Sequence, residues 1–299
     1  MEIRELYLDK ETATTLHGDI YGLDYSMDGP GYFVKYYLDI YNKRIRVIDY
    51  QAEATEDMVK FLDNLAQKNE FGKVFIKARP DDWEKLLPYG FVLEGVFKYY
   101  FNGEHAYCLS KFYTQERRVS MSFDKETEIM EVVSKVNPET DRPKLDPDFH
   151  LREAREGDIP EISALYKRVF KTYPLPLNQP QYVEQLMDDD YLFMVITHGD
   201  KIISSASADI NYKLSNAEIT DCASMPEYRG KGLMFTIIAA MEEELNDRGI
   251  ESLYSLARAL SPGINTVFKK LGYTFTGRLI NNCNIFGNFE DMNLWVKRA

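Results

Sequence analysis

Cysteine and histidine are scarce in this sequence of 299 residues. Its three cysteines, Cys108, Cys222 and Cys283, form no CxxC pair, so the spacing of a disulfide framework or a zinc site is absent. The four histidines are scattered along the chain: His17, His105, His150 and His198. None has the spacing of metal ligands. We therefore expect no bound metal and a reducing compartment, the cytoplasm.

Long hydrophobic runs are also absent. No stretch approaches the ~18 consecutive apolar residues of a membrane span, and residues 1–6 lack the basic and apolar regions of a secretion signal. Lys plus Arg number 36 and Asp plus Glu 48, which gives a formal net charge of −12. This balance disfavours nucleic-acid binding and favours a cationic ligand. Composition thus predicts a globular protein with neither a membrane nor a nucleic-acid partner.

The length is about twice that of a typical domain of ~100–150 residues and predicts two domains. A polar stretch punctuated by Pro138, Pro143 and Pro147 predicts a linker over residues 115–147, part of which, 125–136, has a helical pattern. This linker separates residues 1–114, which we call the first half, from residues 148–299, which we call the second half.

The two halves show the same order of expected elements. In the second half these are a helix over 233–247, a strand over 250–256, a helix from Ser261, and strands over 275–285 and 292–297. In the first half they are a helix over 55–67, a strand over 73–78, a short helix over 81–87, and a closing strand over 108–112. Gly95 follows Gly90 by five residues, as Gly277 follows Gly272. The match predicts a duplicated α/β unit, and chance recurrence of a common order is the alternative.

The segment 217–234 carries the most chemical information. It reads as a strand, a turn at Pro226, a loop with Gly230 and Gly232, and the start of a helix. Backbone amides at such a helix start favour an anion, and Arg229 and Lys231 add positive charge. The spacing is neither a Walker A loop nor a GxGxxG loop. It predicts phosphate binding, with an ordinary tight turn as the alternative.

This segment resembles the signature Q/R-x-x-G-x-G/A of the GNAT acetyltransferase superfamily, with Arg229, Gly232 and Met234 on its three positions. Met234 departs from the family's small residue, and Phe268 stands at the family's usual tyrosine. The resemblance covers residues 148–299. It implies an α/β (α+β) fold with a mixed, mostly antiparallel sheet flanked by helices, preceded by a degenerate GNAT-like first half. It also implies acetyl-CoA as co-substrate, held by Ala223, Ser224, Met225, Arg229, Gly230, Lys231, Gly232, Leu233, Met234, Asn265 and Phe268.

Segments 254–263, 277–283 and 289–297 further resemble the β-lysine N-acetyltransferase family. That resemblance implies acetylation of the ε-amine of β-lysine to give N-ε-acetyl-β-lysine, an osmolyte that serves as a compatible solute in osmoadaptation. Another diamine, a polyamine or a protein lysine are alternative acceptors. A non-catalytic acyl-CoA-binding regulator is the alternative to an enzyme, and a homodimer remains open.

Amine acetylation needs a proton acceptor, because a lysine-type ammonium has a pKa near ~10.4. Glu218 is the preferred candidate, since some members of the superfamily carry a general-base glutamate at this distance before the loop. Asp221 is its rival, although strict alternation along a strand places it on the opposite face unless a bulge intervenes. Backbone amides of residues 223–225 are expected to hold the pantetheine arm and to polarise the thioester. Tyr254 is the candidate proton donor to the leaving thiolate, and direct protonation by the ammonium of the tetrahedral intermediate is the alternative.

β-Lysine carries two ammonium groups and one carboxylate. The carboxylate favours an arginine, and Arg258 and Arg278 are the two candidates. Tyr173 lies where the superfamily's substrate loop is expected, and Asn281 belongs to an asparagine cluster that is either in the site or a set of turn formers. Carboxylates available for the amines are Asp188, Asp189, Asp190, Glu290 and Asp291.

Overall fold

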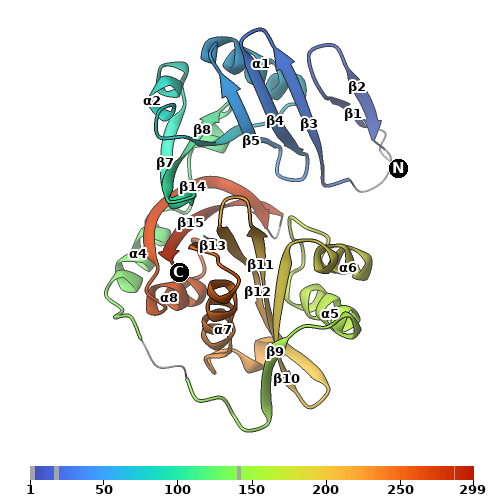
Figure 1. Cartoon of the computed structure of the whole chain (residues 1–299), viewed down its shortest axis with the longest axis vertical. Helices are drawn as coiled ribbons and strands as arrows, with labels where there is room; N and C mark the ends of the chain where they lie inside the picture. The colour runs from blue at the N-terminus through green and yellow to red at the C-terminus, as the bar shows by residue number, and fades with distance from the viewer. Residues whose placement is uncertain (1–3, 17–19, 140–142, 286) are drawn as a thin grey trace.

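The computed structural model describes residues 4–16, 20–139, 143–285 and 287–299, so His17 lies outside the described residues. Figure 1 shows the first half above the second. The first half contains β1 (Arg4–Tyr7), β2 (Ala13–Leu16), β3 (Gly22–Gly29), β4 (Tyr32–Asp39), β5 (Arg44–Ala52), α1 (Thr55–Lys68), β6 (Lys73–Ala78), α2 (Trp83–Leu86), η1 (Leu87–Tyr89), β7 (Val92–Phe101) and β8 (Glu104–Phe112).

Two helices, α3 (Gln115–Arg118) and α4 (Phe123–Ser134), lead into the second half. The second half contains β9 (Phe149–Glu153), η2 (Glu156–Asp158), α5 (Ile159–Val169), α6 (Pro180–Asp188), β10 (Tyr191–His198), β11 (Lys201–Asn211), β12 (Asn216–Ser224), η3 (Pro226–Tyr228), α7 (Leu233–Asp247), β13 (Ser252–Arg258), α8 (Pro262–Lys270), β14 (Thr274–Ile285) and β15 (Asn288–Arg298). The expected helices at 55–67 and 233–247 and the strand at 73–78 are confirmed to within one residue. Among the described residues, no helix has the length and apolar character needed to cross a membrane.

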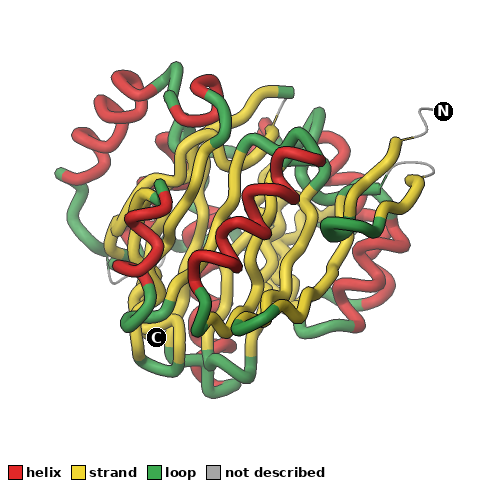
Figure 2. Tube along the Cα trace, turned by 90° about the horizontal axis from the view of Figure 1, so that it is seen from above, coloured by secondary structure: helices red, strands yellow, loops and turns green. Residues whose placement is uncertain are grey.

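A single 13-stranded sheet runs through both halves in the order β3-β4-β5-β6-β8-β7-β14-β15-β13-β12-β11-β10-β9. Its pairs are antiparallel except for β5 with β6 and β12 with β13. The order β3-β4-β5-β6-β8-β7 in the first half therefore repeats as β10-β11-β12-β13-β15-β14 in the second. Figure 2 shows the strands side by side with helices on the outside.

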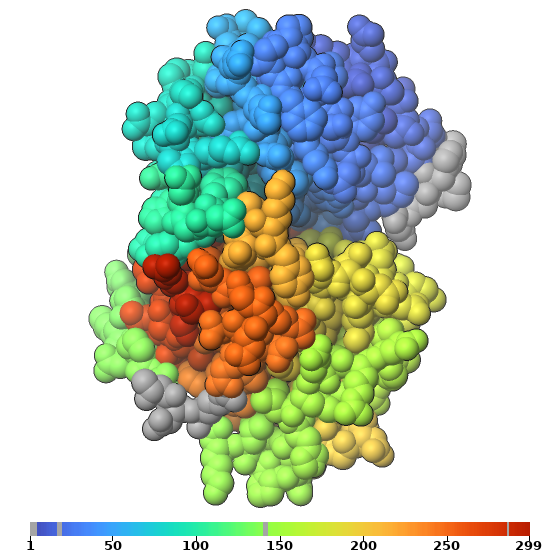
Figure 3. Space-filling view, in the orientation of Figure 1, coloured from blue at the N-terminus to red at the C-terminus, as the bar shows by residue number. Residues whose placement is uncertain are grey.

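The two halves join where β7 meets β14, at the pair Gly95–Gly277. A Cβ atom at Gly277 would overlap the Glu94 carbonyl oxygen and the Gly95 backbone, so only glycine fits there. Figure 3 shows the tip between β11 and β12, in light orange, against the first half. At this contact the Asn216 side chain donates to the Tyr100 carbonyl oxygen at 2.7 Å.

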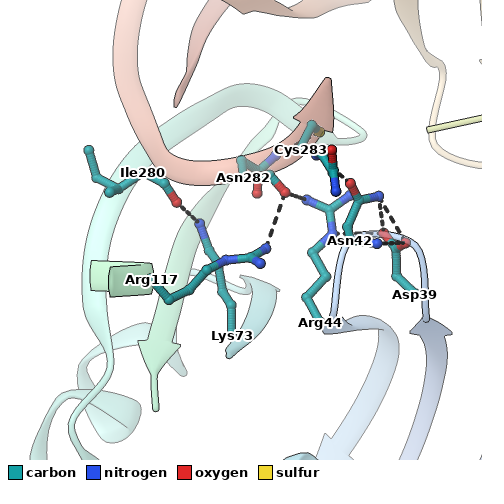
Figure 4. A network of polar contacts seen from close by, with 9 residues as sticks. Asp39, Asn42, Arg44, Lys73, Arg117, Ile280, Asn282 and Cys283 are labelled. Atoms are coloured by element: carbon teal, nitrogen blue, oxygen red, sulfur yellow. Dashed lines mark hydrogen bonds and ion pairs between the residues drawn. The ribbon is translucent and has the colours of Figure 1, made fainter. Parts of the chain in front are cut away.

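Buried polar contacts reinforce this junction (Figure 4). Strand β14 bulges between its pairs at Leu279 and Cys283, and first-half cations bind the carbonyl groups of the bulge. Arg44 donates to the Asn282 oxygen at 2.9 Å and pairs with Asp39 at 2.8 Å. The Lys73 ammonium donates to the Ile280 oxygen at 2.9 Å. Because these buried cations bond to carbonyl groups of β14 as well as to first-half carboxylates, they hold the first half in one position on the second.

The expected linker is packed rather than loose over much of its described length. The expected helix at 125–136 is observed as α4, two residues earlier. Glu126 is buried and accepts from the Arg278 guanidinium at 3.3 Å. Arg117 is buried with its guanidinium 3.6 Å from the centre of the Phe289 ring, and burial lowers its pKa to about 9.

Helices cover the sheet differently in the two halves. In the second half α7 packs on one face through Leu192, Met194 and Ile196, whereas α5 and α6 pack on the other through Phe193 and Val195. In the first half α1 packs on one face, which carries Val34, Tyr36, Leu38, Ile45, Val47, Val74 and Ile76. The opposite face of β3–β6 carries charged side chains and is turned toward the second half.

Candidate active site

Strands β12 and β13 begin as neighbours and then separate. In the described part of the chain their register joins residues 216–218 to residues 252–254 and goes no further. A cavity of about 600 Å³, which we call the first cavity, lies where they part and is lined by Ser224, Leu256 and Val267 among others. Strand edges that face a gap have free amides and carbonyls, so a ligand can bind between them.

One end of the first cavity lies at the start of α7. Gly230 and Gly232 have φ values of 79° and 75°, which favour glycine. The Thr236 amide donates to the Gly232 carbonyl oxygen at 3.1 Å as the helix begins. The amides of residues 233–235 precede that bond and have no acceptor within the helix. Together with Arg229 in the cavity wall, they are donors of the kind that bind a phosphate group.

A bulge in β12 decides where Asp221 lies. The pairing with β11 passes from Thr220–Ser207 to Ala223–Ser205, which leaves an extra residue on β12. Asp221 has a φ of 52°, the left-handed conformation that such a bulge often uses. Simple alternation predicts opposite faces for Glu218 and Asp221, but the bulge intervenes and both carboxylates line one cavity.

Asp221 is the most deeply buried carboxylate of the site, with 2% of its surface exposed. It accepts hydrogen bonds from the Tyr173 hydroxyl at 2.9 Å and from the Ser207 hydroxyl at 2.5 Å. Burial raises its pKa to about 6 even though both hydrogen bonds act to lower it. Burial also raises the pKa of the half-buried Glu218. Carboxylates with raised pKa values are suited to accept protons near neutral pH.

A second cavity, of about 380 Å³, lies between the two halves and adjoins the first. Its wall combines Arg46 and Lys77 from the first half with Asp209 and Glu218 from the second. Six residues line both cavities: Tyr173, Thr220, Asp221, Leu256, Ile285 and Met292. The two cavities therefore meet where these six residues lie, with Asp221 among them.

Comparison with known proteins identifies the family to which this chain belongs. The acetyltransferase (GNAT) family matches residues 159–273. N-acetyltransferase YodP of Bacillus subtilis (strain 168) is 39% identical over 87% of this chain and 94% of that protein. The Beta-lysine N(6)-acetyltransferases of Methanococcus maripaludis and Methanosarcina mazei are 36% and 34% identical, over 86% and 81% of this chain and 93% and 97% of theirs. The chain belongs to the β-lysine N-acetyltransferase family. The expected GNAT fold and N-acetyltransferase class are thereby confirmed.

In this N-acetyltransferase, most of the residues expected to bind the cofactor lie in the wall of the first cavity. These are Ser224, Arg229, Gly230, Gly232, Leu233 and Met234. The exposed Lys231 lies beside them, with its ammonium 5.4 Å from the centre of the Phe149 ring.

The structure corrects the expectation for Asn265 and Phe268. Asn265 is fully buried, donates to the carbonyl oxygens of Arg258 and Ser261, and accepts from the Trp295 indole at 2.8 Å. Phe268 is fully buried in the core behind α8. Neither lines the first cavity, because α8 turns Ile264 and Val267 toward it instead. Both residues therefore stabilise the fold around the site.

The backbone amides of residues 223–225, which are expected to hold the pantetheine arm, do not all face the gap between β12 and β13. The Met225 amide donates to the Ile203 carbonyl oxygen at 2.9 Å and is already engaged by β11. Ala223 is buried on the α5 side. Since successive amides of a strand point in opposite directions, the Ser224 amide faces the gap. Of these three residues, Ser224 is therefore the one whose backbone amide can reach a ligand in the gap.

The residues expected to bind the substrate separate into three groups. Tyr173 lines both cavities, as a substrate-loop residue is expected to do. Arg258 lines the first cavity, but its guanidinium already donates two hydrogen bonds, each of 2.6 Å, to the Glu290 carboxylate. Arg278 and Asn281 lie outside both cavity walls. Arg278 binds Glu126, and the Asn281 amide donates to carbonyls of residues 116, 117 and 119, so both hold the α3–α4 segment.

The remaining candidates also lie outside the cavity walls. Tyr254 pairs beside Glu218 but packs edge-on against Phe97, with ring centres 5.1 Å apart, and burial raises its pKa well above the usual range. The aspartates at 188–190 are exposed at the end of α6. Asp291 is buried and accepts from the Asn281 backbone amide at 2.7 Å. In the described ranges of the chain, no three His, Cys, Asp or Glu side chains are grouped as metal ligands.

Sequence reasoning missed Arg46, Lys77 and Asp209 in the second cavity. The signal for Arg46 is present, because Arg44 and Arg46 alternate with the apolar Ile45 and Val47. Alternation of this kind predicts a strand with one charged face. It does not predict what that face is turned toward.

Proposed function

We propose that this protein transfers the acetyl group of acetyl-CoA to the ε-amine of β-lysine and releases N-ε-acetyl-β-lysine. The observation that carries the proposal is the meeting of the two cavities at Asp221. One cavity has an anion-binding helix start, and the other has carboxylates suited to a cationic amine. The two named β-lysine acetyltransferases among the relatives support the choice of amine. The product bears one ammonium and one carboxylate, which suits a compatible solute made in the cytoplasm for osmoadaptation.

Acetyl-CoA fits the residues of the first cavity. The amides of residues 233–235 and the Arg229 guanidinium would hold the pyrophosphate. No atom lies within 4 Å of the position that a Cβ would take at Gly230, which leaves room for close backbone approach there. When bound, acetyl-CoA supplies an acetyl group activated as a thioester.

The proton of the amine is assigned to a carboxylate at the junction of the cavities. Asp221 lines both cavities and Glu218 only the second, so Asp221 is the better placed acceptor and Glu218 the alternative. The ε-ammonium first loses one proton to the Asp221 carboxylate, which passes it to solvent. The neutral amine nitrogen then forms a bond to the acetyl carbon, and the carbon–sulfur bond breaks. As the new bond forms, the nitrogen becomes more acidic and its proton passes to the Asp221 carboxylate.

The other two demands of the reaction are met by groups at the gap. The Ser224 amide is the donor available to the acetyl oxygen as that oxygen gains negative charge. Tyr254 lies outside the cavity walls, so the thiolate would receive its proton from the nitrogen of the tetrahedral intermediate, either directly or through Asp221.

The test is a panel of amines with purified protein and acetyl-CoA, followed by thiol release and product mass. β-Lysine should give the highest kcat/KM, and fragmentation should place the acetyl group on the ε-amine. Preference for spermidine or a lysine-containing peptide would instead support a polyamine or protein acceptor. Cofactor binding without thiol release from any amine would support a regulator.

A further inference from the structure

The first half of the chain presents two cations to the second cavity. Arg46 lies on β5 opposite Phe75 on β6, and Lys77 follows Phe75 by two residues on the same face. All three line the second cavity. The alternate residues Ile45, Val47 and Ile76 pack toward α1. Strands β5 and β6 thus bury one face against α1 and carry Arg46 and Lys77 on the other face, which lines the second cavity.

Neither cation forms an ion pair with a carboxylate in the described parts of the chain. The Arg46 guanidinium lies 5.9 Å from the centre of the Tyr37 ring. The Lys77 ammonium donates to the Tyr100 hydroxyl at 2.9 Å and lies over aromatic rings, 4.3 Å from the centre of Tyr100 and 5.1 Å from that of Tyr254. The neighbouring Arg44, by contrast, is paired with Asp39 at 2.8 Å.

Carboxylates of the second half line the same cavity. Asp209 and Glu218 belong to paired positions on β11 and β12, and Asp221 marks the junction with the first cavity. Burial raises the pKa values of Asp209 and Glu218, and the positive charges of Lys77 and Arg46 oppose part of that rise. Positively and negatively charged side chains therefore line the same small cavity.

The charges of this cavity are complementary to those of a diamino acid. A substrate with its reacting amine at Asp221 has carboxylates available for its ammonium groups and two unpaired cations available for a carboxylate. A polyamine or a peptide lysine side chain has no carboxylate, so it would leave Arg46 and Lys77 unpaired. Buried or half-buried charges left without a partner disfavour binding.

We infer that Arg46 and Lys77 bind the carboxylate of the amine substrate, so that the first half selects diamino acids over other diamines. Arginine provides a planar pair of donors that matches a carboxylate, and lysine provides a compact charge fixed by its ring contacts. The inference rests on the proposed function for the position of the reacting amine. It gives the first half a role in specificity.

The test compares β-lysine with 1,4-diaminopentane, the same diamine without the carboxylate. The measured quantity is the ratio of their kcat/KM values in wild type, Arg46→Met and Lys77→Met. Methionine keeps an unbranched apolar side chain of similar length and removes the charge. Each variant should lower the ratio by about 10–100-fold, the effect of losing one charge-assisted contact. Arg46→Lys should recover part of it.

Lys201→Met is the matched control. Lys201 is exposed at the start of β11 and lines neither cavity, so its loss should leave the ratio within about twofold of wild type. Acetyl-CoA affinity and thermal unfolding of each variant establish that the fold is intact.

The outcomes separate this inference from the proposed function. If wild type prefers β-lysine and neither Arg46→Met nor Lys77→Met changes the ratio, the inference is wrong and the proposed function stands. If wild type acetylates α-lysine instead, the same variants are tested with α-lysine against 1,5-diaminopentane, and a fall in that ratio supports the inference while the β-lysine assignment fails. If wild type prefers diamines without a carboxylate, both are wrong.

Discussion

Replacing Asp221 by asparagine is expected to stabilise the fold at neutral pH. The carboxylate is 2% exposed, and burial raises its pKa from 3.8 to about 6. This difference of about 2 pKa units corresponds to up to about 3 kcal/mol of unfolding free energy, at about 1.4 kcal/mol a unit. Asparagine carries no charge. Its amide oxygen can accept from one of the Tyr173 and Ser207 hydroxyls, which bond to different carboxylate oxygens of Asp221, and its NH2 group can donate to the other.

The pH dependence of this stabilisation has a definite sign. The folded-state pKa lies above the unfolded value, so the protonated form of Asp221 favours folding. That contribution is fully present below the unfolded value of 3.8 and is lost as the pH rises through about 6. Asp221→Asn should therefore raise the midpoint of thermal unfolding by roughly 5 °C at pH 7.5, and the gain should shrink toward zero near pH 4.

The same change should remove a proton acceptor. Wild-type turnover should rise as the pH passes through about 6 and Asp221 ionises. At pH 7.5 Asp221→Asn should lower kcat by about 10²–10⁴-fold while acetyl-CoA affinity holds. The loss should become smaller toward pH 10, because free amine is then present. Thiol release at saturating β-lysine measures this.

Two results would refute this reasoning. Wild-type turnover by Asp221→Asn at neutral pH would remove Asp221 from the role of base and leave Glu218 as the candidate. An equal unfolding midpoint for variant and wild type at both pH 4 and pH 7.5 would contradict the cost assigned to the buried charge.

Three further changes test the second carboxylate, the cofactor loop and the junction. Glu218→Gln should lower kcat less than Asp221→Asn does, and an equal or larger loss would reverse their assignment. Gly232→Val should raise the acetyl-CoA dissociation constant about tenfold or more, because the backbone there has a φ of 75° and the new Cβ would lie 2.9 Å from Pro143. Unchanged affinity by calorimetry would contradict the loop assignment. Gly277→Ala should lower the unfolding free energy, measured by urea titration, by about 1–3 kcal/mol or more, because the new Cβ would overlap the Glu94 carbonyl oxygen. An unchanged unfolding free energy would mean that the β7–β14 junction adjusts.

Much of the fold follows from short-range pattern. The apolar spacing of residues 233–247 and the glycines before it specify α7 and its loop, and the structure has both where the pattern places them. Helical periodicity and left-handed glycine positions depend on neighbouring residues, so they are readable from the sequence. Strands β3, β4 and β5 were missed, although the alternation in Tyr32–Asp39 and the turn at Gly31 are typical of a hairpin.

The site residues depend on contacts between distant segments. Asn265 and Arg278 carry the polar groups expected of a ligand site, but buried partners in the fold, Trp295 and Glu126, engage them. Nothing near either residue in the chain indicates these partners. Whether a polar side chain serves a ligand or the fold is decided by which groups the tertiary structure places beside it.

By itself the sequence indicated the family, the glycine loop that we propose to bind phosphate, and the two candidate carboxylates. Only the tertiary structure decided that Asp221 shares a cavity with Glu218, because the bulge depends on how β12 pairs with β11. Only the tertiary structure brought Arg46 and Lys77 to a cavity whose carboxylates Asp209 and Glu218 lie more than a hundred residues further along the chain. Local pattern specifies which face of a strand is charged, and long-range packing decides what that face meets.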